Sequence, residues 1–219
     1  MSDAAPAAKR VHRGVRRRER TREKLVAAAW RVMARKGVDA TAIAEITEEA
    51  DVAFGSFYNH FASKEAIVEA VAALAVERHG AALDRLTAAI EDPAEVMAVS
   101  VRRTVRMVES DPIWGWFVVR LGIAHATLRA GLGRRAARDL ALGVDAGRFA
   151  VADVPSALLA FGGAVLATMQ GRLDGLTGEG AAERVAGYVL RMLGIPAAEA
   201  DAIAQRPLPP APDPEEENA

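Results

Sequence analysis

The chain has 219 residues, of which 51% are hydrophobic and none is cysteine. This length and apolar content suffice for one large domain, or for a small domain joined to a larger one. The lack of cysteine excludes disulfides, thiolate metal sites and a cysteine nucleophile. The sequence has no run of about 18 uninterrupted apolar residues and no secretory signal, so we expect a cytoplasmic protein without a membrane span.

Charge is distributed unevenly along the chain, although the net charge is only −1. Residues 1–22 hold eight basic and two acidic side chains, a net charge of +6, so the remainder carries −7. We interpret residues 1–18 as a flexible basic arm that suits a polyanion, with Arg16, Arg17 and Arg18 near its end. A solvated basic tail without a partner is the alternative on charge alone.

The next segment shows the spacing of an amphipathic helix from Arg20 onward. Gly37 is expected to end that helix in the left-handed conformation, and Thr41 stands where the N-cap of a second helix belongs. A tight turn at Asp51 precedes a further short helix over residues 53–61. Ser63 is then expected to cap a helix that begins at about residue 64 and runs to residue 80 or beyond. The apolar positions predicted to be buried are Leu25, Val26, Ala29, Val32, Met33, Ile43, Ile46, Ala50, Ile67, Val71 and Leu74.

Two short helices joined by a tight turn are typical of a helix-turn-helix, whose second helix enters the DNA major groove. In this interpretation Phe57 and Phe61 are buried struts, while polar neighbours face phosphates or bases. The alternative is that the aromatic residues form the core of a small helical bundle. The predicted DNA contacts are Thr41, Phe54, Gly55, Ser56, Tyr58, Asn59, His60 and Lys64, together with Arg16, Arg17 and Arg18.

Residues 20–67 resemble the DNA-binding domain of the tetracycline-repressor (TetR) type bacterial regulators. Two positions depart from the family pattern: Asp51 replaces the usual turn glycine, and Phe54 stands where a lysine or proline is common. Because Asp tolerates the left-handed conformation, we expect the turn to survive. The residues that match in order and spacing are Gly37, Thr41, Ile43, Ile46, Ala50, Val52, Gly55, Ser56, Tyr58, His60, Phe61, Lys64 and Glu65.

The resemblance implies an all-α fold, with an N-terminal three-helix DNA-binding domain and a larger C-terminal helical ligand-binding and dimerisation domain. It also implies a homodimer that reads the two halves of a palindromic operator in double-stranded DNA. The expected domains are the basic arm at 1–18, the helix-turn-helix domain at 19–66, the regulatory and dimerisation domain at 67–205 and a disordered acidic, proline-rich tail at 206–219.

The remainder of the chain has helical periodicity without alternating strand patterns. Asp92 with Pro93, and Asp111 with Pro112, are predicted N-caps followed by proline at the first helical position. We expect a loop over residues 142–155. Further helices are expected from about 155 to 173 and from 181 to 193.

Small residues spaced by four along the helix predicted at 155–173 would let two helices approach closely. Together with the family resemblance, this stripe places the dimer interface at roughly residues 155–193. The alternative is an internal packing seam of one protomer. The predicted interface residues are Gly163, Ala167, Gly171, Val185, Val189 and Met192.

An effector pocket is predicted within residues 100–170, where aromatic and methionine side chains are concentrated. Arg120 could pair with an acidic ligand group, and His125 could exchange a hydrogen bond with the ligand. The alternative is that these side chains are ordinary core. The predicted lining is Met107, Trp114, Trp116, Phe117, Arg120, His125, Phe161, Met169 and Gln170.

These patterns favour a sequence-specific transcriptional regulator, a repressor that a small-molecule ligand releases from its operator. A regulator without small-molecule control, constitutive or governed by a protein partner, is the alternative. An enzyme is not expected, because the sequence has no nucleophile elbow, phosphate-binding loop or dinucleotide fingerprint. The four histidines are scattered without metal-ligand spacing, so no cofactor or metal is expected.

Overall fold

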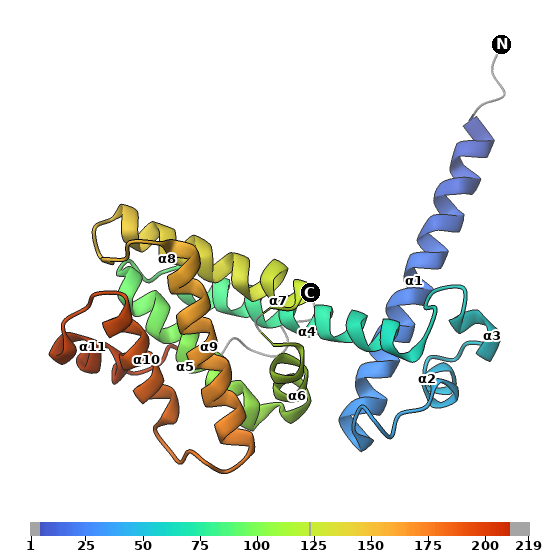
Figure 1. Ribbon diagram of the computed structural model, residues 1–219. Coiled ribbons are helices and arrows are strands. Elements are labelled where there is room, and N and C mark those ends of the chain that lie inside the picture. Colours follow the sequence, from blue (N-terminus) through green and yellow to red (C-terminus); the bar gives the residue numbers. More distant parts are fainter. Residues whose placement is uncertain (1–4, 123, 211–219) are drawn as a thin grey trace. The chain divides into compact units, whose positions relative to one another are not determined.

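The computed structural model describes residues 5–122 and 124–210 (Figure 1). These residues form helices and no strand, which confirms the all-α prediction. The chain divides into two compact units, Met1–Ala72 and Ala73–Ala219.

The first unit is a small helical domain built around one long helix. Its elements are α1 (Ala5–Lys36), α2 (Ile43–Glu49), α3 (Phe54–Phe57) and the first part of α4 (Lys64–Thr87). Helix α1 begins much earlier than the sequence indicated, so residues 5–18 are helical rather than an irregular arm. The reason is that Ala, Arg and Lys, which dominate this segment, are good helix formers. The N-terminal part of α1 extends beyond α2 and α3 (Figure 1).

The core of this unit consists of the apolar faces that the helical periodicity predicted. The fully buried side chains include Leu25, Met33, Ile46, Phe57, Ile67 and Val71. Ile43 is half-buried rather than buried, and so is Leu74 just beyond this unit. Two backbone predictions are confirmed: Gly37 has a φ of 84° at the end of α1, and Asp51 has a φ of 54° in the turn between α2 and α3.

The left-handed backbone at Asp51 gives a test of how tightly this turn is constrained. Asp51→Val is expected to lower the free energy of unfolding of the first unit by about 1–2 kcal/mol, because a branched side chain strongly disfavours positive φ. Asp51→Gly should stay within about 0.5 kcal/mol of the parent protein, since glycine has no Cβ to clash. Urea denaturation followed by helical circular dichroism measures both. Equal stability of the Val and Gly variants would contradict the assignment.

The second unit contains the remainder of α4 and all later helices. They are α5 (Pro93–Ser110), α6 (Pro112–Leu121), α7 (Ala126–Leu128), the π-helical turn η1 (Arg129–Gly133), α8 (Arg134–Asp145), α9 (Val154–Leu173), α10 (Ala181–Met192) and α11 (Ala197–Ala204). The predicted caps are confirmed, because the Asp92 side chain accepts from the Ala94 amide and the Asp111 side chain from the Trp114 amide. The loop predicted at 142–155 is shorter, since α8 continues to Asp145.

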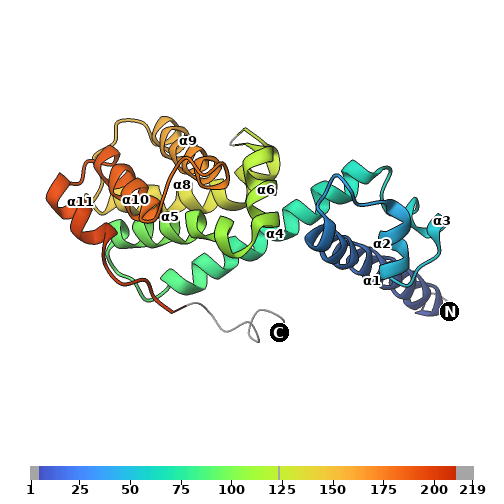
Figure 2. The ribbon, with the colours of Figure 1, turned by 90° about the horizontal axis from the view of Figure 1, so that it is seen from below.

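Helix α5 lies at the centre of this unit and packs against α6, α8, α9, α10 and α11 (Figure 2). A buried ion pair joins α5 to α10, with Arg102 Nε 3.1 Å from Glu183 Oε1. The same α5 surface holds the chain beyond α11: Arg102 donates to the Arg206 carbonyl at 2.7 Å, and Arg103 donates to that of Pro209. The beginning of the expected disordered tail is therefore bound to α5, while residues 211–219 lie outside the described residues.

Candidate nucleic-acid interface and effector cavity

Helix α3 and the turn after it carry two exposed aromatic side chains next to two buried ones. The two predicted struts are confirmed, because Phe57 and Phe61 are buried and their ring centroids lie 5.7 Å apart. Phe54 and Tyr58 are 52% and 54% exposed, and their rings meet edge to face at 5.9 Å. The short helix expected over 53–61 is shorter in the structure, since residues 58–60 form a turn.

Most of the predicted DNA contacts are accessible in the structure, and three of them are half-buried. Those three are Ser56, His60 and Lys64. Lys64 donates to the Asp39 carbonyl at 2.9 Å, which leaves two of its ammonium protons for a phosphate. The exposed residues are Arg16, Arg17, Arg18, Phe54, Gly55, Tyr58 and Asn59.

Thr41 does not belong to this surface, which corrects the sequence prediction. Its side chain is 2% exposed, and its hydroxyl donates to the Gly37 carbonyl at 2.7 Å. It is not the N-cap of α2 either. Ala42 takes that position, and its amide donates to the Glu45 carboxylate at 2.8 Å. Thr41 is therefore a buried residue that stabilises the loop between α1 and α2.

The basic side chains of α1 fall into two groups. At its C-terminal end, Arg31 and Arg35 both pair with Glu49, at 2.8 and 2.7 Å, and Lys36 pairs with Glu45. Arg16 and Arg17, by contrast, form no ion pair within the described part of the chain. Positive charge free to meet an anion is therefore concentrated in the N-terminal part of α1.

Arg18 and Arg22 link α1 to the turn after α3. Arg18 donates to the Asn59 carbonyl at 3.0 Å, and the Arg22 guanidinium lies 5.1 Å from the Phe61 ring centroid. Burial, and then Arg18 and Arg22, lower the pKa of His60. His60 is therefore neutral at pH 7 and can both donate and accept a hydrogen bond.

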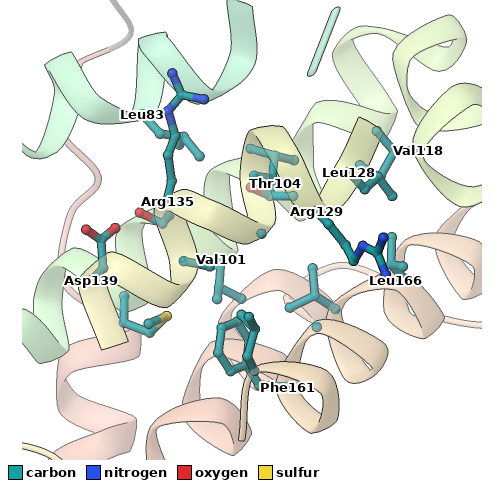
Figure 3. Close-up of a pocket in the computed structure, with 18 of the residues that line it drawn as sticks. Leu83, Val101, Thr104, Val118, Leu128, Arg129, Arg135, Asp139, Phe161 and Leu166 are labelled. Atoms are coloured by element: carbon teal, nitrogen blue, oxygen red, sulfur yellow. The ribbon is translucent and has the colours of Figure 1, made fainter. Parts of the chain in front are cut away.

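The second unit contains a cavity of about 190 Å³ (Figure 3). Its lining comes mainly from α4, α5, α8 and α9, together with Val118 of α6 and the α7–η1 segment, and most of it is aliphatic. The apolar lining is Leu83, Met97, Val101, Val118, Leu128, Leu132, Ala136, Leu158, Leu159, Phe161, Val165 and Leu166, with Gly133 and Gly162. The polar lining is Asp84, Thr87, Ser100, Thr104, Arg129, Arg135 and Asp139.

Charged residues form a connected network at one end of this cavity. Arg135 pairs with Asp84 at 2.7 Å and with Glu77 at 2.6 Å, so it holds α8 against α4. Gly80 leaves room for this guanidinium, because a Cβ at that position would lie 2.6 Å from Arg135 Nη1. Arg138 bridges Asp84 and Asp139, at 2.8 and 2.7 Å.

Two of the three carboxylates of this network, Asp84 and Asp139, have pKa values shifted in opposite directions. Burial raises the pKa of Asp139 above its ordinary value, and Arg138 offsets this only in part. Burial also acts to raise the pKa of Asp84, but hydrogen bonds from Arg135 and Arg138 lower it overall. Asp139 is therefore the more basic carboxylate and the better acceptor for a ligand hydroxyl.

Nine residues were predicted to line a pocket, and only one of them, Phe161, lines this cavity. The predicted lining is therefore corrected. Three large apolar residues of the predicted lining fill the core instead: Trp114, Phe117 and Met169 are fully buried. Arg120 lies over the Trp116 ring, and the His125 side chain accepts from the Thr127 amide as the cap of α7. Gln170 donates to Asp174, and Met107 accepts from the Ser110 hydroxyl.

The residues predicted for a dimer interface also separate into two groups. Val185, Val189 and Gly171 are buried inside the protomer, so they belong to its core. Met192 and Ala167 are exposed, and Gly163 has open space where a Cβ would be. Two further exposed apolar residues were not predicted from the sequence, Leu159 of α9 and Tyr188 of α10. Tyr188 and Met192 are four residues apart on α10, a helical spacing that could have revealed them.

His79 is a buried histidine beside the cavity, 7% exposed, and burial lowers its pKa to about 4 from an ordinary 6.5. Between these values the unfolded chain binds the proton more readily than the folded one. The stability that neutral His79 allows is therefore complete above pH 6.5 and is lost as pH falls toward 4. Lowering the pH from 8 to 5 should cost about 2 kcal/mol of unfolding free energy through this residue.

Urea denaturation of the parent protein and of His79→Phe at pH 8 and pH 5 isolates this contribution. Phenylalanine keeps a ring against Trp114 but cannot be protonated. The variant should lose about 2 kcal/mol less between the two pH values than the parent protein does. The same pH dependence in both proteins would show that His79 does not titrate as its burial requires.

The part of the chain that the structure describes has no candidate metal site and one helix long and apolar enough to span a membrane. No group of three or more His, Cys, Asp or Glu side chains could hold a metal ion there. Helix α9 is long and apolar enough to cross a membrane, but many core helices of soluble proteins have the same length and composition. Phe161, Val165 and Met169 of this helix are buried within the second unit, as in a core helix.

Two family models match the chain. One is described as "Bacterial regulatory proteins, tetR family" and matches residues 25–71, and the other as "Tetracyclin repressor-like, C-terminal domain" and matches residues 92–206. A curated relative, the "Uncharacterized HTH-type transcriptional regulator YvdT" of Bacillus subtilis (strain 168), is 42% identical over 50 residues. That match spans 23% of this chain and 26% of the relative's length.

Solved structures extend the similarity over both units. RolR in complex with its ligand resorcinol is 42% identical, with a TM-score of 0.81, over 90% of this chain and 100% of that chain. RolR without ligand superimposes with a TM-score of 0.78. FadR from Bacillus subtilis in complex with stearoyl-CoA is 19% identical, with a TM-score of 0.61, over 80% of this chain and 99% of that chain. The FadR similarity bears on the fold alone.

Proposed function

Because the chain belongs to the tetracycline-repressor (TetR) family of bacterial transcriptional regulators, we propose that it is a homodimeric repressor released from a palindromic operator by a small aromatic ligand. The observation that carries this proposal is the cavity of about 190 Å³ with a charged end in the second unit. We place the protein in the cytoplasm, where its operator DNA is. Catalysis forms no part of this proposal.

Operator recognition is assigned to the exposed surface of α3 and the turn that follows it. Tyr58 and Asn59 face bases or phosphates, and Phe54 offers an apolar surface to a thymine methyl group. Arg16 and Arg17 on the N-terminal part of α1 contact the phosphate backbone of the DNA. This helix thus provides the basic contacts that the sequence suggested for a flexible arm. Because these contacts are electrostatic, affinity should fall steeply with salt.

Dimerisation is assigned to α9 and α10. The exposed apolar side chains of Leu159, Tyr188 and Met192 would be covered by the same surface of a second copy, as a two-fold interface requires. Gly163 and Ala167 would let the paired helices approach closely. A dimer presents two recognition surfaces, and it must match half-sites about one helical turn apart, roughly 34–36 Å.

The ligand is proposed to be a single aromatic ring that carries hydroxyl groups. An apolar cavity of about 150 Å³ holds one benzene molecule, so 190 Å³ suits one ring with small substituents. The half-buried Asp139 carboxylate would accept a hydrogen bond from a phenolic hydroxyl, with Arg135 beside it. The 42% identity to RolR, which was solved with resorcinol, supports this chemistry.

The proposed coupling runs through α4, which begins at Lys64 in the first unit. Arg135 and Arg138 hold Glu77 and Asp84 of this helix, so a ligand that draws on the same network would shift α4. A shift of a few ångströms would change the separation of the two recognition surfaces. By linkage, saturating operator must weaken ligand binding by the factor by which ligand weakens operator binding.

The test is a titration of the protein into a fluorescent duplex of its own upstream intergenic DNA, at two salt concentrations, beside an unrelated duplex of equal length. We expect tight, salt-sensitive binding of two protomers that prefers the protein's own DNA, and release by resorcinol. Equal, weak binding to both duplexes would overturn the operator assignment. Specific binding that no hydroxylated aromatic relieves would instead favour a regulator that is constitutive or controlled by a protein partner.

A further inference from the structure

A second polar group lines the cavity away from its charged end. Thr104 of α5 contributes its hydroxyl, and Figure 3 shows this side chain well apart from Arg135 and Asp139. The Thr104 hydroxyl lies 3.0 Å from His79 Nε2 on α4. The Thr104 hydroxyl is therefore a hydrogen-bonding group of the cavity outside the network of Arg135 and Asp139, as are Thr87, Ser100 and Arg129.

The partner of Thr104 packs against an aromatic ring and carries no charge at neutral pH. His79 is buried, and its ring packs against the Trp114 ring with centroids 4.6 Å apart. Since burial lowers the pKa of His79 to about 4, its imidazole is neutral at pH 7. A neutral imidazole nitrogen either donates or accepts one hydrogen bond, so it occupies only part of what the hydroxyl offers.

A second cavity threonine shows what an ordinary helical threonine does. Thr87 donates its hydroxyl proton to the Leu83 carbonyl of its own helix, at 2.9 Å, which is the usual local bond. Thr104 is bonded instead to a side chain of another helix. A hydroxyl has one proton and two lone pairs, and His79 takes one of these three positions. Thr104 thus keeps hydrogen-bonding capacity on a wall of the cavity.

We propose that Thr104, positioned by His79, is a second hydrogen-bonding subsite of the cavity and selects rings that carry two polar substituents. One substituent would meet the charged end at Asp139, and the other would meet the Thr104 hydroxyl. The inference rests on the proposed function, because it assumes that the cavity takes a hydroxylated ring. It adds the specificity: a benzenediol binds more tightly than phenol, which can satisfy only one of the two places.

Isothermal titration calorimetry with phenol, resorcinol and hydroquinone tests this on the full-length protein. The parent protein should bind at least one of the two diols about tenfold or more tightly than phenol. Thr104→Val removes the hydroxyl while keeping the shape, and should abolish most of that preference while leaving phenol affinity within about threefold. Thr104→Ser restores a hydroxyl and should restore the preference.

Two further variants separate a binding role from a structural one. Thr87→Val removes a cavity hydroxyl to which the proposal assigns no ligand substituent, so the ratio of diol to phenol affinity should stay unchanged. His79→Phe removes the group that orients Thr104, so the ratio should fall in the same direction as for Thr104→Val. A variant that combines His79→Phe with Thr104→Val should lose no more of the diol preference than Thr104→Val alone, since both residues act through one hydroxyl.

The outcomes distinguish this inference from the function on which it rests. If the parent protein binds phenol as tightly as both diols, or if Thr104→Val weakens all three equally, the second subsite is wrong while the phenol-binding cavity stands. If the parent protein binds none of the three, the proposed ligand class itself fails, and the subsite with it. The first comparison uses only the parent protein, so it holds even if a variant does not fold.

Discussion

Glu183→Gln is expected to lower the free energy of unfolding of the second unit by about 3–5 kcal/mol, because it leaves a buried guanidinium without its carboxylate. Arg102 is 4% exposed and Glu183 is 8% exposed. The same carboxylate also accepts from Arg106 at 2.5 Å. Burial, and then Arg106 and Arg102, lower the pKa of the neighbouring Arg103, which reflects the crowding of positive charge on α5.

Thermal unfolding followed by circular dichroism measures this effect, with Glu95→Gln as the control. Glu95 pairs with Arg206 on the surface, where loss of an ion pair costs less than about 1 kcal/mol. For a unit of this size, a loss of 3–5 kcal/mol lowers Tm by about 10 °C or more. Equal Tm values for the two variants would show that Arg102 finds another partner or water, and that the pair does not hold α5 against α10.

The fold was largely predictable because its signals are local. Periodicity marked the buried faces, and Asp92, Asp111 and Gly37 marked helix ends through bonds to residues at most four positions away. The start of α1 was predicted too late because residues 5–18 are mainly Ala, Pro, Arg and Lys without the regular apolar spacing that indicates a helix. Burial of Thr41 was missed for a related reason: its bond to Gly37 depends on a loop and not on a helical pattern.

The cavity was hard to predict because it is a place where helices leave space, and no local pattern marks missing atoms. The predicted lining followed the aromatic residues of α6, of which Trp114 and Phe117 instead fill the core. The charged end joins residues far apart in the chain, such as Asp84 and Arg138. One signal was available: Arg135 lies three residues before Arg138 and four before Asp139 on α8, a helical spacing that brings a carboxylate close to guanidinium groups.

On the proposed function, Val101→Phe is expected to give a protein that binds operator DNA normally and no longer responds to ligand. Val101 is buried on α5 and lines the cavity between its charged end and Phe161 (Figure 3). A phenyl ring at this position would occupy the space proposed for the ligand ring. Ligand affinity should fall about 100-fold or more, while unfolding free energy should change by less than about 1.5 kcal/mol, because the added atoms enter a cavity.

Val101→Ala is the matched control, since it enlarges the same cavity. It should destabilise the protein by about 1–3 kcal/mol yet still bind resorcinol and still be released from operator DNA. Calorimetry measures ligand affinity, and fluorescence anisotropy of a labelled operator duplex measures release. Because the substituted position is in the second unit, operator affinity without ligand should stay within about threefold of the parent protein for both variants. If Val101→Phe still released operator at the ligand concentration that releases the parent protein, the effector would have to bind outside this cavity.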